Sequence, residues 1–133
     1  MNLIRSSMVV FFLVLFSATA SSDSLVSFKC SYDFDGEESF NRFTVDMEEK
    51  VAEYALLEKD DSIRFESTNL KVIVAPSHIT IIDPGTVTVT HKISRKDLSY
   101  QRDRTGYAGS YPVSGTETGT CKKIEIETAD NIF

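Results

Sequence analysis

Apolar and polar residues alternate one by one along several short stretches of this chain. In residues 86–93 (TVTVTHKI), every second position carries Val, His or Ile, and the positions between them carry Thr or Lys. Successive side chains of a β-strand point to opposite faces, so this alternation is typical of a strand with one buried face. Similar runs predict further strands at residues 25–32, 43–47, 63–66, 79–83, 98–100 and 123–127.

Turn residues separate these runs at short intervals. Pro84 and Gly85 form a tight-turn dipeptide, and the acidic segment 33–38 contains Gly36, which can adopt positive φ. Residues 70–75 (LKVIVA) are almost continuously apolar, which predicts a strand covered on both faces. Short strands at regular spacing predict an all-β fold, a small antiparallel barrel or sandwich of about eight strands.

The segment 46–59 fits two structures. Met47, Val51 and Tyr54 fall at helical spacing, and Asp46 with Glu49 has the pattern of a capping box, so a single short helix near 47–58 is one interpretation. In the other, residues 48–49 form a hairpin tip and residues 51–57 a returning strand. We favour the hairpin, because every neighbouring segment is predicted to be a strand.

The first twenty residues have the pattern of a signal peptide. Arg5 precedes an apolar run at residues 8–16, and Ala18-Thr19-Ala20 offers the small residues that a signal peptidase accepts. Nine apolar residues are too few to span a bilayer, which needs about 20, although a retained anchor is the alternative. We expect cleavage before Ser21 and a single β domain over 21–133. The protein would then be periplasmic or secreted, with no membrane span after signal removal.

The chain has two cysteines, Cys30 and Cys121, near opposite ends of the predicted domain. In an exported protein such a pair is most simply a disulfide, and two reduced buried thiols are the alternative. Cys121 has the opposite parity to Ile124 and Ile126, so we expect it just before its strand or at a bulge.

Composition and motifs exclude several functions. The chain has 14 basic and 20 acidic residues, a net charge of −6, whereas a nucleic-acid partner requires clustered Lys and Arg. The sequence contains no G-x-S-x-G, H-E-x-x-H, P-loop or G-x-G-x-x-G motif. We therefore expect no nucleic-acid partner and no cofactor, and we assign no catalytic residues and no metal ligands.

Four motifs resemble a group of short exported proteins of marine bacteria and their phages. They are Phe43-Thr44-Val45-Asp46, Ile79-Thr80-Ile81, the segment 93–100 (ISRKDLSY) and Gly119-Thr120-Cys121. The group shares a signal, an Ile-x-Arg-x-x-Leu-x-Tyr-like strand and a closing Gly-x-Cys. The resemblance covers about the last 90 residues and implies export and a similar fold style, without implying a chemistry.

Three weaker signals for chemistry also have structural explanations. His91 lies on the apolar face of its strand, where a core histidine satisfied by a hydrogen bond is expected more often than a ligand or base. Ser77, His78 and Asp83 supply the residue types of a catalytic triad without any triad motif. The acidic segment 33–38 could bind a hard cation, but its glycine does not have EF-hand spacing, which favours a solvated loop.

The segment 103–119 has a different composition from the rest of the chain. It contains four glycines, Pro112 and two tyrosines, so we predict a long loop, either a binding loop or a mobile crossover. Tyrosines in a loop supply rigid contact surface, and arginines can pair with a carboxylate or phosphate. The candidate binding residues are Tyr107, Tyr111, Arg102, Arg104 and Arg95.

These observations favour a non-catalytic binding or accessory module outside the cytoplasm. Its partner would be a small ligand or an envelope protein, because small barrels offer concave ends for either. A hydrolase acting on cell-envelope material is the first alternative. An inhibitor or envelope structural protein that pairs through an exposed sheet edge is the second.

Overall fold

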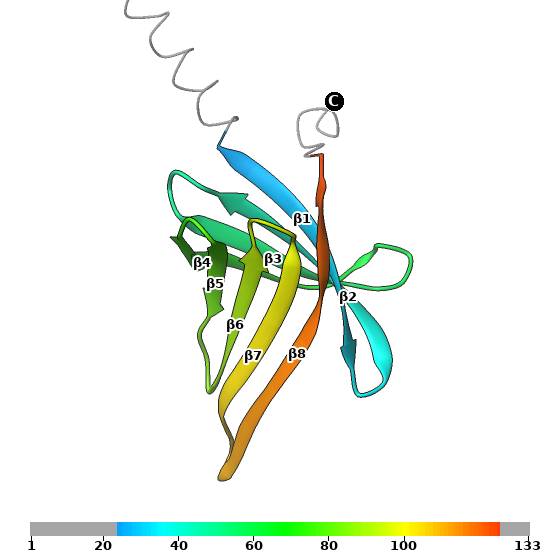
Figure 1. The fold of residues 1–133 in the computed structure, drawn as a ribbon. Coiled ribbons are helices and arrows are strands. Elements are labelled where there is room, and N and C mark those ends of the chain that lie inside the picture. The colour runs from blue at the N-terminus through cyan, green and yellow to red at the C-terminus, as the bar shows by residue number, and fades with distance from the viewer. Residues whose placement is uncertain (1–23, 126–133) are drawn as a thin grey trace, which may run out of the picture.

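Eight antiparallel strands, joined in sequence order, form a closed barrel (Figure 1). The computed structural model describes residues 24–125, and no helix occurs among them. The strands are β1 (Leu25–Phe34), β2 (Glu37–Asp46), β3 (Val51–Leu57), β4 (Ile63–Val74), β5 (His78–Asp83), β6 (Val87–Ser94), β7 (Ser99–Ala108) and β8 (Tyr111–Ile124). The prediction of an all-β antiparallel barrel or sandwich of about eight strands is confirmed, and of the two the fold is a barrel.

The barrel has two distinct ends. The turns between β2 and β3, β4 and β5, and β6 and β7 lie at one end, together with residues 24 and 125. We call this end the mouth. The other four turns lie at the opposite end, which we call the far end, and there the β7–β8 hairpin extends beyond its neighbours (Figure 1).

The ring closes where β1 pairs with β8, and the disulfide lies in this seam. Cys30 and Cys121 are direct cross-strand partners and are bonded to each other, as predicted. The expectation that Cys121 precedes its strand or sits at a bulge is wrong, because it lies inside β8. Its opposite parity to Ile124 has a simpler cause: Cys121 faces inward, whereas Ile124 pairs with Ser27 on the outer face.

The contested segment 46–59 is a hairpin rather than a helix. β2 and β3 pair over residues 40–57, and the turn between them carries Lys50 at a φ of 59°. The carboxylate of Asp46 accepts hydrogen bonds from the backbone N–H groups of Glu48 and Glu49. An aspartate that caps free N–H groups suits a turn as well as a helix start, which explains the helical signal.

Inward-facing residues of the strands fill the middle of the barrel. The least exposed side chains include Cys30, Phe43, Val45, Ile81 and Ile93, each at 0%. The alternating run of β6 is buried only in its second half: His91 and Ile93 are buried, whereas Val87 and Val89 are half-buried near the far end. The period-two pattern therefore identified the inward face but not how deeply each residue lies.

One strand prediction needs correction. Residues 70–75 were expected to be covered on both faces, yet Ile73 is 46% exposed between the buried Val72 and the half-buried Val74. The barrel wall is a single layer, so an outward side chain contacts solvent unless another element covers it. β4 is also longer than expected, because Asn69, at a φ of 58°, lies where the β3–β4 register shifts and the strand continues past it.

The segment 103–119 is not a loop. β7 and β8 pair without a break from Ser99–Thr120 to Ala108–Tyr111, leaving only Gly109 and Ser110 in the turn. Two of the glycines that suggested a loop instead provide space inside strands. A Cβ at Gly119 would collide with the backbone of Ser31, and one at Gly115 would collide with the side chain of Arg104.

Candidate functional site

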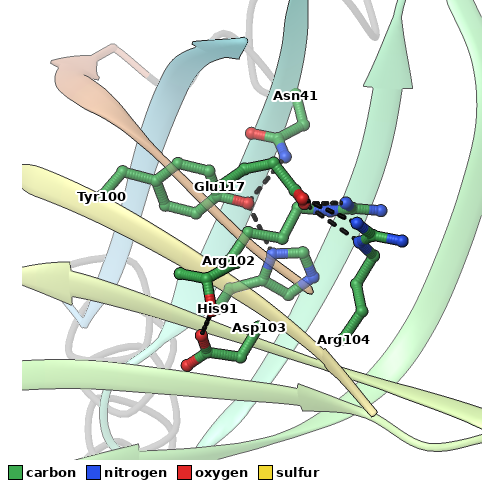
Figure 2. A network of polar contacts seen from close by, with 8 residues as sticks. Asn41, His91, Tyr100, Arg102, Asp103, Arg104 and Glu117 are labelled. Atoms are coloured by element: carbon green, nitrogen blue, oxygen red, sulfur yellow. Dashed lines mark hydrogen bonds and ion pairs between the residues drawn. The ribbon is translucent and has the colours of Figure 1, made fainter. Parts of the chain in front are cut away.

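Polar side chains from four strands meet inside the barrel, on the far-end side of its apolar middle. Figure 2 shows this group, which we call the inner polar cluster. All of its members come from inward-facing positions of β2, β6, β7 and β8. They are Asn41, His91, Tyr100, Arg102, Arg104 and Glu117.

Two arginines share one carboxylate in this cluster. Arg104 forms a fork with Glu117, from Nε to Oε1 at 3.1 Å and from Nη2 to Oε2 at 2.8 Å. Arg102 donates from Nη1 to the same Oε1 at 2.5 Å. The side chains of Arg102, Arg104 and Glu117 are only 17%, 22% and 9% exposed. Two positive charges and one negative charge are therefore held together with little contact with water.

The arginines determine the charge state of Glu117. Burial by itself raises the pKa of this carboxyl group, but the hydrogen bonds and positive charges of Arg104 and Arg102 outweigh burial. The resulting pKa is below the ordinary value for glutamate. Glu117 is thus ionised at neutral pH, and the three charged groups sum to one excess positive charge.

Aromatic rings cover the two guanidinium groups. The ring centre of Phe34 lies 5.6 Å from Arg102 Cζ and 5.1 Å from Arg104 Cζ. Tyr32 lies 5.4 Å from Arg102 Cζ. Arginine packs well against aromatic faces, so these contacts help to hold the cations inside the barrel.

A second part of the cluster links three uncharged groups. The Tyr100 hydroxyl accepts a hydrogen bond from Asn41 Nδ2 at 3.1 Å and lies 2.6 Å from His91 Nδ1 (Figure 2). Its own hydrogen is then available for His91 Nδ1, which assigns the imidazole proton to Nε2. The His91 ring also stacks on the rings of Tyr100 and Tyr54.

Burial keeps this histidine neutral. His91 is 1% exposed, and burial, assisted by the nearby positive charge of Arg102, lowers its pKa to about 3. Burial also raises the pKa of Tyr100. The expectation of a hydrogen-bonded core histidine is confirmed, and neither group changes protonation near neutral pH.

His91 should make the fold sensitive to mild acid. Its pKa is lower in the folded protein than the ordinary value of about 6.5, so below pH 6.5 the unfolded chain takes up a proton that the folded chain does not. We expect stability to fall as pH drops from 6.5, by at most about 1.4 kcal/mol per pH unit. Urea denaturation at pH 7.0, 6.0 and 5.0 measures this slope.

A His91→Gln variant should lose the slope between pH 6.5 and 5, whatever its stability at pH 7. The matched control is His78→Gln, which removes the exposed histidine and should keep the slope. An equal slope in all three proteins would show that His91 is not the acid-sensitive group.

Three buried polar atoms in the cluster lack a hydrogen-bond partner within residues 24–125. They are Asn41 Oδ1, His91 Nε2 and Arg102 Nε. Buried polar atoms are nearly always paired, so three in one cluster are unusual. Asn41 and His91 are also among the least exposed residues, at 0% and 1%. The only signal for this grouping in the sequence was His91, which lies on the otherwise apolar face of its strand.

The five candidate binding residues lie in three separate places. Arg102 and Arg104 belong to the inner polar cluster. Tyr107 and Tyr111 are 60% and 76% exposed at the tip of the β7–β8 hairpin. Tyr107 pairs with Pro112 and Tyr111 pairs with Ala108, so the two tyrosines lie on opposite faces of the hairpin. Arg95 lies at the mouth, where its Nη1 donates to the carbonyl of Ala75 at 3.0 Å.

The residue types of a triad do not come together. His78 Nδ1 lies 2.9 Å from Ser77 Oγ, but His78 and Asp83 occupy opposite ends of β5, about 16 Å apart at the usual rise per residue. The acidic segment 33–38 is mostly strand, with a tight turn at Asp35 and Gly36. Within residues 24–125, no group of three or more His, Cys, Asp or Glu side chains is arranged to hold a metal ion.

A pocket opens at the mouth, with a volume of about 220 Å³. Its floor is apolar, because Phe28, Ile79 and Ile93 are buried beneath it. Two cationic side chains, Arg95 and Lys123, also line it. The remaining lining residues are Val26, Met47, Ser94 and Leu98. We call this the mouth pocket; the sequence suggested only Arg95, because the other residues are far apart along the chain.

No protein-family model matches this chain, and no curated protein or solved structure is detectably similar to it. In the part of the chain that the structure describes, no helix is long and apolar enough to cross a membrane.

Proposed function

We propose that the protein is a non-catalytic binding module that works outside the cytoplasm and takes a small amphiphilic anion into the mouth pocket. The observation that carries this proposal is the combination of an apolar floor with two cationic side chains. Ligand pockets are usually mostly apolar, with a few polar groups that orient the ligand, and the end of a β-barrel is a common place for them.

The pocket's size and charge define the ligand class. A volume of about 220 Å³ is below the usual range for drug-sized ligands, which favours a short acyl chain or a single ring. Arg95 and Lys123 would face the polar end of such a molecule, and a carboxylate matches their charge. The apolar end would rest on Phe28, Ile79 and Ile93.

Two features support a site of action outside the cytoplasm. The sequence of residues 1–20 predicts export, although these residues lie outside the described part of the chain. The Cys30–Cys121 disulfide fits an oxidising compartment, because such bonds rarely persist in the cytosol. Both features suit a periplasmic or secreted protein.

Hexanoate and 1-hexanol are suitable probes, because they share an apolar chain and differ in charge. We expect hexanoate to bind more tightly than hexanol, as measured by isothermal titration calorimetry at low salt. Replacing both cations, by Arg95→Gln and Lys123→Gln, should weaken hexanoate binding by about 2- to 30-fold, since each exposed charge pair contributes about 0.2–1 kcal/mol. Hexanol binding should not change.

The matched control is the double variant Arg64→Gln, Lys92→Gln, which makes the same change in net charge on the outside of the barrel. It should bind hexanoate like the wild type. If hexanoate does not bind, or if both double variants bind it equally well, the mouth pocket is not an anion-binding site.

A further inference from the structure

One edge of Arg102 has no partner. Arg102 uses Nη1 to reach Glu117, whereas Nε is buried without a hydrogen bond, and no hydrogen bond from Nη2 occurs within the described residues. The neighbouring Arg104 uses its Nε and Nη2 to hold both oxygens of Glu117. The side edge formed by Nε and Nη2 is thus filled by a carboxylate in one arginine and open in the other.

A second buried donor lies next to this open edge. His91 and Arg102 are direct cross-strand partners of β6 and β7, and both face inward. The contacts of Tyr100 place the imidazole proton on His91 Nε2, which has no hydrogen-bond partner among the residues that the structure describes. Two unpaired N–H donors therefore project from neighbouring positions of the barrel wall.

The charge of this region also calls for an anion. Among residues 24–125, only the carboxylate of Glu117 lies within hydrogen-bonding distance of Arg102 and Arg104. In the described part of the chain, Asp35 also acts on Arg104 through its charge, but it is an exposed residue of the β1–β2 turn. A half-buried excess positive charge is costly in a low-dielectric interior, and a bound anion would offset that cost.

We propose that the barrel has a second ligand site at its far end, in which the open edge of Arg102 binds a carboxylate group through Nε–H and Nη2–H. His91 Nε2–H is the neighbouring donor for the same group. A guanidinium edge and a carboxylate match in geometry, as Arg104 and Glu117 already demonstrate in this cluster. Binding would pair two of the three unpartnered atoms of the inner polar cluster.

The ligand would reach this site from the far end. The Phe34 ring, which is 37% exposed, lies over both guanidinium groups and has to move aside. The mouth pocket is separate, because the buried side chains of Phe28, Phe43 and Val45 fill the barrel between the two sites. The second site therefore does not depend on the function proposed for the mouth.

NMR of the arginine Nε–H groups tests this proposal directly. In ¹⁵N-labelled protein at pH 7, formate or acetate should shift the Arg102 Nε–H signal progressively until it saturates, with a dissociation constant of about 1 mM, since so small a ligand offers few contacts. Sodium chloride at equal ionic strength is the reference, and phosphate is a second arm that distinguishes a carboxylate site from a general anion site.

Two variants complete the test. Arg102→Lys keeps the positive charge but removes the Nε–Nη2 edge, so it should identify the Arg102 signal by its loss. It should also reduce the rise in melting temperature that acetate produces in the wild type to the part that comes from the mouth pocket. Arg64→Lys, on the exposed part of β4, should keep that rise. If Arg102→Lys does not fold, the NMR titration of the wild type still shows whether an arginine Nε–H group binds carboxylates.

Three results would overturn the proposal. They are an Arg102 Nε–H signal that does not respond to carboxylates, shifts that chloride reproduces, and equal shifts at all arginines. A response to phosphate but not to formate or acetate would contradict the carboxylate assignment as well.

Discussion

Replacing Glu117 by Gln should destabilise the protein by about 3–5 kcal/mol, the usual cost of breaking a buried ion pair by removing one partner. Glu117 is the shared acceptor of Arg102 and Arg104, and its side chain is 9% exposed. Glutamine fits the same space but removes the negative charge. Two like charges would then remain close together inside the barrel.

Urea denaturation at pH 7 measures this loss. Glu66→Gln makes the same chemical change at an exposed position of β4 and should alter stability by less than about 0.5 kcal/mol. A loss below about 1 kcal/mol in Glu117→Gln would mean that water already solvates the two arginines. In that case, the argument from excess buried charge would also fail.

Removing the disulfide should lower stability by about 2–5 kcal/mol. The bond joins residues 91 positions apart, so it restricts most of the unfolded chain. It also ties β1 to β8, the two strands whose pairing closes the barrel. We expect Cys30→Ala with Cys121→Ala to show this loss; alanine is preferred to serine because Cys30 is 0% exposed and a buried hydroxyl would add its own cost.

Reducing the wild type with a thiol provides an independent measurement of the same effect. The reduced protein and the double variant should have similar urea midpoints, both well below that of the oxidised protein. The exported protein should also begin at Ser21, with an intact mass two hydrogens below that of the reduced chain. Retention of Met1, or two free thiols after isolation, would contradict export and the bond respectively.

The sequence alone was sufficient for the class of fold and for most of the strands, but not for β8 and the second half of β7. Alternation with period two is a local property, because it follows from the direction of successive side chains in a strand. It identified the inward faces of β1, β2 and β6. The two cysteines predicted the disulfide, and the structure places that bond at the seam between β1 and β8. The segment 103–119 was misread because its glycines are also typical of loops.

Only the tertiary structure determined how deeply each residue is buried and which residues of other strands it contacts. The register of β7 and β8 brings Arg102, Arg104 and Glu117 together and separates Tyr107 from Tyr111, although all five lie in one hairpin. Barrel closure brings together the residues of the mouth pocket from four strands and two turns. The reason for a glycine at position 115 is visible only in the structure, where the side chain of Arg104 occupies the space that a Cβ would need. Such contacts depend on which strand lies opposite which, and a periodic pattern within one strand carries no information about its partner's register.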